Sequence, residues 1–157
     1  MIGYINEDII TVPFQALVNP VNTVGVSGKG VALQVKRKYP EVYAAYRDVC
    51  NAGSLKVGGA FTYIRKKPVA HGEVDIVINL ATKGDWRFPS KLEYIELCMQ
   101  SLVTEINQHR ISSLTMPRLG CGHGGLDWKD VEPIVLRHLN PIKNCSVFIC
   151  HKEVNNE

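Results

Sequence analysis

Short apolar runs alternate with stretches of helical periodicity along most of the chain. Runs rich in β-branched and aromatic residues predict strands at residues 2–5, 16–19, 60–64, 74–80, 112–116 and 146–150. Between them, apolar residues recur at helical spacing and predict helices over residues 31–38, 41–50, 92–106 and 128–139. This alternation favours an α/β sandwich with a mixed central sheet. Since no repeat or linker interrupts it, residues 1–157 are expected to form one domain.

Two of the predicted helices begin with a capping signal. Ser90 and Glu93 have the spacing of a capping box, in which the serine side chain accepts from the N–H of Glu93 and the carboxylate reaches back. Leu92 would then begin the inward face of that helix. Asp127 directly precedes the last helix, so N-capping is its expected role.

Two glycine-rich stretches each stand between a predicted strand and a predicted helix. In residues 17–33 an apolar run turns polar at Asn22 and Thr23, and three glycines follow; residues 117–128 contain four glycines. This arrangement presents backbone N–H groups and a helix N-terminus to an anion. In an open α/β sheet both loops would face one crevice. Tight turns alone are the plainer explanation, but two such loops favour a diphosphate clamp.

Neither loop matches a common nucleotide-binding signature. A Walker A loop needs GxxxxGK[ST], whereas Gly28-Lys29 is followed by Gly30 and preceded five residues earlier by Thr23. A dinucleotide fingerprint needs GxGxxG, whereas the first loop has GxxGxG and the second does not fit either. A hydride-carrying NAD is therefore not supported, and no cofactor is expected.

Composition changes this picture little. The chain of 157 residues is 45% hydrophobic and 21% charged, and its net charge of +3 permits but does not indicate a nucleic-acid partner. Its five cysteines include no CxxC pair, which argues against a disulfide framework or a zinc site. There is no signal-peptide pattern and no apolar run long enough to span a bilayer, so we expect a cytoplasmic protein with no membrane contact and no metal.

Several motifs, in order along the chain, resemble the macro domain family, whose members bind ADP-ribose. They are residues 6–9, 16–22, 28–32 and 116–128. The resemblance covers nearly the whole chain and implies a three-layer α/β/α fold. It is closest to the branch that contains the terminal ADP-ribose glycohydrolases and the bacterial antitoxin DarG, to which residues 22–30, 82–87 and 89–93 are also similar.

The resemblance implies a ligand contact for each matching residue. Asp8 would accept from the exocyclic amine of adenine, and Asn22 would hydrogen-bond the distal ribose, although both are also common turn residues. Backbone N–H groups of the two loops would surround the diphosphate, where glycine allows close approach. The implied ADP-ribose-binding residues are Asp8, Ile9, Asn22, Thr23, Gly28, Lys29, Gly30, Val31, Cys121, Gly122, His123, Gly124, Gly125 and Leu126.

Lys83 is the expected catalytic residue. It follows the carboxyl end of an apolar strand, and a desolvated lysine has a lowered pKa and can act as a nucleophile. The family mechanism implies attack on the anomeric carbon of the distal ribose, giving a lysyl–ADP-ribose that water releases. A lysine that only adds positive charge is the plainer alternative. The eukaryotic glycohydrolases have an aspartate inside the second loop, a region that in this chain reads His123-Gly124-Gly125, with Asp127 further on. His123 would either relay protons or point into water.

The resemblance thus implies an ADP-ribosyl hydrolase. Its expected target is ADP-ribosylated thymidine in DNA, modified by a DNA ADP-ribosyltransferase. The alternatives are removal of ADP-ribose from protein carboxylates, a non-catalytic ADP-ribose reader, and a phosphatase of ADP-ribose phosphate. Trp86 and Arg87 can stack on a base or hold a phosphate, which suggests contact with single-stranded DNA. The same track would include Lys29, Arg65, Lys66, Lys67 and Lys91. A solvated basic face with one packed tryptophan is the plainer explanation.

Overall fold

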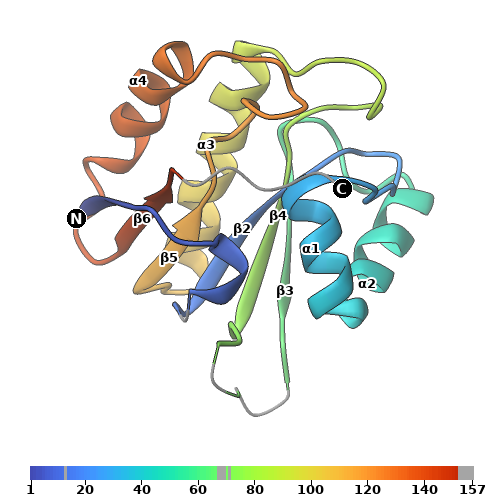
Figure 1. The fold of residues 1–157 in the computed structure, drawn as a ribbon, viewed down its shortest axis with the longest axis horizontal. Coiled ribbons are helices and arrows are strands. Elements are labelled where there is room, and N and C mark those ends of the chain that lie inside the picture. The colour runs from blue at the N-terminus through green and yellow to red at the C-terminus, as the bar shows by residue number, and fades with distance from the viewer. Residues whose placement is uncertain (13, 67–69, 71, 152–157) are drawn as a thin grey trace.

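The computed structural model describes residues 1–12, 14–66, 70 and 72–151. Within them, one six-stranded sheet has the order β1-β6-β5-β2-β4-β3 (Figure 1). Its strands are β1 (Ile2–Ile5), β2 (Ala16–Val21), β3 (Ala60–Ile64), β4 (Ile76–Ala81), β5 (Ser113–Met116) and β6 (Ser146–Cys150). The helices are the short η1 (Ile9–Thr11), α1 (Gly30–Lys38), α2 (Pro40–Asn51), α3 (Leu92–Gln108) and α4 (Trp128–Leu139). Neighbouring strands are parallel except β3 and β4, so the sheet is mixed, as predicted.

Helices cover both faces of the sheet and give the three layers expected. α1 and α2 pack on one face, around Tyr39 and Tyr46, and α3 and α4 pack on the other. α3 meets the sheet through Ile95, Met99 and Leu102, which are the apolar positions predicted to face inward. β2 and β4 are largely apolar because both of their faces are buried. Among the described residues, no helix is long and apolar enough to cross a membrane.

The predicted strands and helices match the observed ones closely, apart from the start of α3. Lys91 is its N-cap and makes no side-chain capping bond, while the hydroxyl of Ser90 donates to the carbonyl of Thr82 at 2.5 Å. The predicted capping box is therefore wrong, because the fold brings another acceptor to the serine. Leu92, expected to face inward, is exposed. The role of Asp127 is confirmed, since it caps α4 by accepting a backbone N–H two residues on at 3.0 Å.

Three connections meet at one edge of the sheet, at the top of Figure 1. They follow β2, β4 and β5, which are mutually parallel, so the carboxyl ends of these strands lie together. We call residues 22–29 the first loop, residues 82–91 the bridging segment and residues 117–127 the second loop. Ligands of open α/β sheets bind at this edge.

Candidate active site

The first loop is folded around the side chain of Asn22. Its Oδ1 accepts from the N–H groups of Val24, Gly25 and Val26 at 3.0–3.2 Å, and its Nδ2 donates to the carbonyl of Val26 at 2.7 Å. An amide nitrogen carries two hydrogens, so one N–H is left for a ligand. The contact of Asn22 with a ribose stays a prediction, and it is limited to that hydrogen.

Helix α2 supports the first loop through two tyrosine hydroxyls. Tyr46 Oη lies 2.7 Å from the carbonyl oxygen of Asn22 and 2.9 Å from its Oδ1, and Tyr43 Oη donates to the carbonyl of Gly25 at 3.1 Å. Burial raises the pKa of Tyr46, so its hydroxyl keeps the proton that these bonds need. Gly25 has a φ of +87°, a conformation that favours glycine. The loop is therefore held in shape by the protein itself.

The first loop ends at the N-terminus of α1, where backbone donors have no partner among the described residues. The N-cap is Lys29, and its side chain makes no capping bond. Within the described ranges, the N–H groups of residues 28–31 have no acceptor. A Cβ added at Gly28 would meet nothing within 4 Å, so the fold leaves this space open. These are the N–H groups expected to hold a phosphate, and the positive end of α1 favours an anion there.

The second loop is drawn into a tight turn by its own backbone. Leu126 N–H donates to the carbonyl of Gly120 at 2.9 Å, and a Cβ added at Gly124 would overlap that same carbonyl group. At Gly122, by contrast, a Cβ would meet nothing within 4 Å. The N–H groups of residues 122–124 find no acceptor in the described part of the chain. The second loop thus presents a second row of unpaired donors.

The bridging segment is hydrogen-bonded to both loops. The carbonyl of Gly84 accepts from the N–H of Thr23 at 2.9 Å and from its hydroxyl at 3.3 Å. The N–H of Ser90 donates to the carbonyl of Gly124 at 2.9 Å. Thr23, expected to contact the ligand, is therefore engaged with the bridging segment. The three connections are thus joined to one another by hydrogen bonds.

Lys83 lies in the bridging segment with its amine beside the second loop. Its Nζ is 3.3 Å from the carbonyl oxygen of Trp86 and 3.5 Å from that of His123. Burial lowers the pKa of Lys83; the carboxylate of Asp85 opposes this shift and the charge of Lys29 adds to it. A larger fraction of the nucleophilic neutral amine is therefore present than for an exposed lysine. The predicted proximity of Lys83 to the loops is thus observed.

Asp85 is the ionised neighbour of Lys83 that sequence reasoning missed. It accepts from the backbone N–H and the Nε of Arg87, both at 2.9 Å, and from Nη2 at 2.6 Å. These bonds hold the pKa of Asp85 at about 2, so it is a carboxylate and not an acid. Its place two residues after Lys83 was the available signal. The side chain of His123 is exposed, and its catalytic role stays a prediction.

The other predicted contacts are divided between core and surface. Asp8 caps η1 by accepting from the N–H of Ile10 at 3.2 Å, and its other oxygen accepts no bond from a described residue. The side chain of Ile9 packs in the core, so only its backbone can face a ligand. Leu126 packs against the core, and burial raises the pKa of the Cys121 thiol to about 11.

Across the described ranges, no cluster of His, Cys, Asp and Glu can hold a metal.

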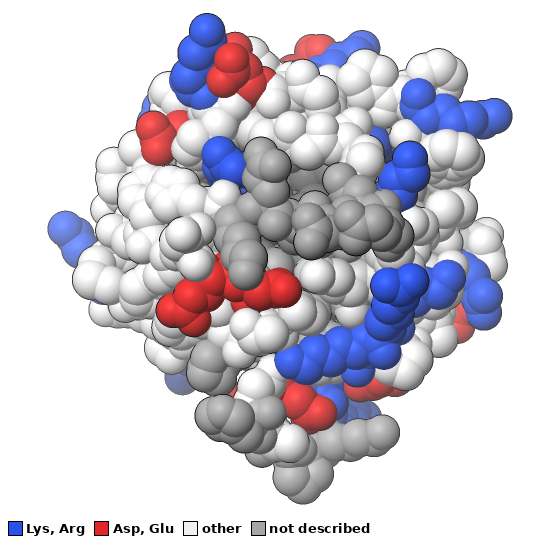
Figure 2. Space-filling model, viewed as in Figure 1, with Lys and Arg blue, Asp and Glu red and all other residues white. Residues whose placement is uncertain are grey.

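The basic residues expected to form one DNA track do not lie together. Arg65 follows the end of β3 farthest from the loops and pairs with Glu41 at 3.1 Å and with Glu73 at 3.2 Å. Its side chain is only 5% exposed, so its assignment to the track is wrong. Lys67 lies outside the described residues. Figure 2 shows basic side chains gathered near the lower end of α1, whose last turn carries three of them, away from the loops.

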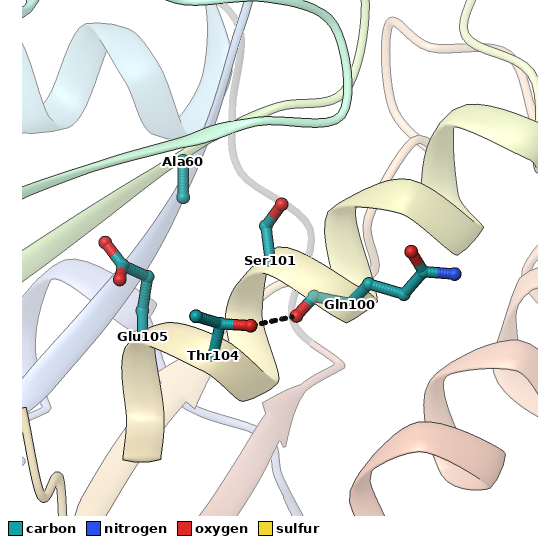
Figure 3. Close-up of a pocket in the computed structure, with 5 residues that line it drawn as sticks. All are labelled: Ala60, Gln100, Ser101, Thr104 and Glu105. Carbon is teal, nitrogen blue, oxygen red and sulfur yellow. Dashed lines mark hydrogen bonds between the residues drawn. The ribbon is translucent and has the colours of Figure 1, made fainter. Parts of the chain in front are cut away.

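A hollow of about 290 Å³ lies between β3 and α3, on another part of the molecule (Figure 3). It is lined by Ala60, Gln100, Ser101, Thr104 and Glu105. The hydroxyl of Thr104 donates to the carbonyl of Gln100 at 3.1 Å, and that of Ser101 to the carbonyl of Gly58 at 2.7 Å. Both hydroxyls are already paired, whereas the N–H groups of residues 28–31 and 122–124 have no acceptor among the described residues, so the two loops mark the stronger candidate site.

The sequence and the fold both have close counterparts. A family model described as Macro domain matches residues 18–135. The chain is 40% identical over 149 residues to a Thermus aquaticus protein named DNA ADP-ribosyl glycohydrolase, a match that covers 95% of this chain and 41% of that protein. The chain thus spans about two fifths of the length of the curated relatives it matches.

Two solved structures extend the comparison. The macrodomain of Mycobacterium tuberculosis DarG has a TM-score of 0.90 and 40% identity, over 96% of this chain and 97% of that one. Thermosipho africanus DarTG in complex with ADP-ribose has a TM-score of 0.79 and 32% identity, over 87% of this chain and 38% of that one.

Proposed function

This chain belongs to the macro domain family, and we propose that it is an ADP-ribosyl hydrolase that removes ADP-ribose from a base in DNA. The observation that supports this most strongly is the amine of Lys83, held beside the second loop with its pKa lowered. Relatives of the same fold are named for DNA ADP-ribosyl glycohydrolase activity, and one was solved with ADP-ribose. Thymidine as the modified base and single-stranded DNA as its carrier are the finer parts of the proposal.

ADP-ribose is held mainly by the main chain in this proposal. The diphosphate lies between the unpaired N–H groups of residues 28–31 and those of residues 122–124. The open space at Gly28 and Gly122 supports this, because the fold does not itself fill it. The remaining N–H of Asn22 contacts the distal ribose, and the free oxygen of Asp8 accepts from the adenine amine.

Lys83 then carries the chemistry. Its neutral amine attacks the anomeric carbon of the distal ribose, and the bond from that carbon to the base breaks with its electron pair going to the base. The departing base takes up the proton that the attacking amine loses. Water next cleaves the lysyl–ADP-ribose, which returns the free amine and ADP-ribose. The lowered pKa of Lys83 supports this role, because only the neutral amine has a lone pair to donate. His123 is the proposed proton relay.

Lys83→Ala tests the proposal. The variant should release ADP-ribose from an oligonucleotide carrying ADP-ribosylated thymidine at least ~10³-fold more slowly, because no other group replaces the nucleophile. Its affinity for ADP-ribose, measured by calorimetry, should change only slightly, since both loops are intact. Lys143→Ala is the matched control, because Lys143 is an exposed lysine that precedes β6 at the opposite edge of the sheet.

Each contrary result identifies a different alternative. A wild type that binds ADP-ribose but releases none, from DNA or from a glutamate-modified protein, would be a reader. Faster release from the protein than from DNA would make it a carboxylate deacylase, and action on ADP-ribose phosphate alone would make it a phosphatase. Full activity in Lys83→Ala would exclude the lysine as nucleophile.

A further inference from the structure

Two large aromatic side chains beside the candidate site are exposed to solvent over half or more of their surface. Trp86 is 50% exposed and Phe88 is 65% exposed, and both belong to the bridging segment. Neither packs in a hydrophobic cluster of the described residues, whereas the chain's other tryptophan, Trp128, packs against the core. Burying an aromatic ring stabilises a fold, so folding does not account for their exposure.

The segment that carries these two rings is fixed at both ends. Gly84 is bonded to the first loop and Ser90 to the second, and Phe88 N–H donates to the carbonyl of Asp85 at 3.2 Å to close a turn between them. The carbonyl oxygen of Trp86 is 3.3 Å from the Nζ of Lys83. The rings therefore belong to a braced turn whose backbone contacts the amine of Lys83.

The charges around the turn indicate what kind of target fits. Asp85 and Arg87 neutralise one another, which leaves the positive charges of three lysines. They are Lys83 beside the second loop, Lys29, whose charge acts on Lys83, and Lys91, three residues after Phe88. An unpaired nucleotide offers a flat ring to the aromatic faces and a phosphate to the lysines. An acidic peptide would meet the lysines but leave the aromatic faces in water.

We propose that Trp86 and Phe88 form a stacking platform for the unpaired bases that flank the modified base in single-stranded DNA. The identity of the substrate rests on the proposed function. Every base has a π-face, so such a platform favours single strands without selecting a sequence. In a duplex the same faces are covered by neighbouring base pairs, and the platform has nothing to hold.

The direct test is binding of a short, unmodified single-stranded oligonucleotide, measured by fluorescence anisotropy. Trp86→Ala and Phe88→Ala should each raise Kd roughly 5- to 150-fold, the range for loss of one base–aromatic stack. Trp86→Phe keeps a ring and should retain most of the affinity. Ile64→Ala is the matched control, because Ile64 is a 50% exposed aliphatic residue at the opposite edge of the sheet.

The second readout is substrate preference. The ratio of kcat/KM for an ADP-ribosylated oligonucleotide to kcat/KM for an ADP-ribosylated nucleoside should exceed one in the wild type. It should fall toward one in the double variant Trp86→Ala, Phe88→Ala, because only the oligonucleotide has flanking bases. Ile64→Ala should keep the wild-type ratio.

The two proposals fail in different ways. Unmodified DNA does not require hydrolysis, so tight binding that the double variant loses supports the platform even where the wild type releases no ADP-ribose. A Kd of the double variant within twofold of the wild-type value would overturn the platform. Equal affinity of the wild type for the single strand and for a duplex of the same sequence would also overturn it. A third contrary result would be a Trp86→Ala variant that loses affinity only for ADP-ribosylated peptides.

Discussion

At the scale of single residues, Asn22 determines the shape of the first loop. Its side chain joins three backbone N–H groups to one carbonyl and meets the hydroxyl of Tyr46. The motif predicted a contact between Asn22 and the ribose, and it did not predict the hydrogen bonds that Asn22 makes within the loop. A sequence shows only that an asparagine lies in a turn, which is compatible with either role. Its partner Tyr46 lies 24 residues away on another element, a distance that no local pattern covers.

Tyr46→Phe should weaken ADP-ribose binding about tenfold, equivalent to ~1.4 kcal/mol. The free energy of unfolding should fall by about 1 kcal/mol, since one buried hydroxyl is lost while the ring remains. Calorimetry and urea unfolding measure the two effects. Tyr63→Phe is the control, because the hydroxyl of the partly buried Tyr63 has no hydrogen-bond partner in the described ranges. Unchanged affinity in a destabilised Tyr46→Phe would show that the loop holds its shape without the hydroxyl.

At the scale of elements, glycines in the second loop serve two separate purposes. Gly124 is required by the fold, because any side chain there would overlap the carbonyl of Gly120. Gly122 has open space around it and is required only if something else approaches. The same distinction separates Gly25, which has a positive φ, from Gly28, which has empty space beside it.

Gly122→Ala and Gly124→Ala should therefore differ in kind. The first should leave the free energy of unfolding unchanged or raise it by about 0.5 kcal/mol, because it restricts the unfolded chain. It should still weaken ADP-ribose binding roughly tenfold or more, since a methyl group would occupy the approach of a phosphate oxygen. The second should lower the unfolding free energy by about 1–3 kcal/mol through overpacking. Equal ADP-ribose affinity in Gly122→Ala and wild type would remove Gly122 from the site.

Helices and strands were predictable from the sequence where apolar periodicity is strong, as in α3 and α4. Prediction failed at Ser90, because a local capping pattern competes with the carbonyl of Thr82, which only the folded chain brings near. The bridging function of residues 82–91 was hidden for the same reason. Its bonds run to Thr23 and Gly124, and nothing in its own composition shows them. Lys83 was found by motif context, whereas the pairing of Asp85 with Arg87 was not.

At the scale of the whole molecule, the two edges of the sheet have different roles. In the described part of the chain, unpaired backbone donors gather at the carboxyl edge, while the opposite edge contains the ion pairs of the buried Arg65 side chain. The layered fold and mixed sheet were predictable from the alternation of elements, but the strand order was not. The basic run at residues 65–67 suggested a DNA surface because burial cannot be read from composition. One domain over residues 1–157 stays a prediction.

Arg65→Met should lower stability without altering the site. Loss of the pairs with Glu41 and Glu73 should reduce the free energy of unfolding by about 2 kcal/mol, less than for a wholly buried pair because both carboxylates are partly exposed. At temperatures where the variant is folded, kcat/KM should match the wild-type value. Lys66→Met, beside it and exposed, is the control in urea unfolding. A fall in kcat/KM in folded Arg65→Met would contradict this separation of the two edges.

The main-chain grip proposed for the two loops has a consequence for how such a protein changes over generations. The donors of residues 28–31 and 122–124 persist in any descendant that keeps the path of the backbone, has no proline at these positions and keeps the open space at Gly28 and Gly122. Trp86, Arg87 and Phe88 project from a turn and belong to no core cluster of the described chain. Descendants can exchange these three residues and acquire a new target without rebuilding the nucleotide pocket. Binding of ADP-ribose and binding of the molecule that carries it can then evolve independently.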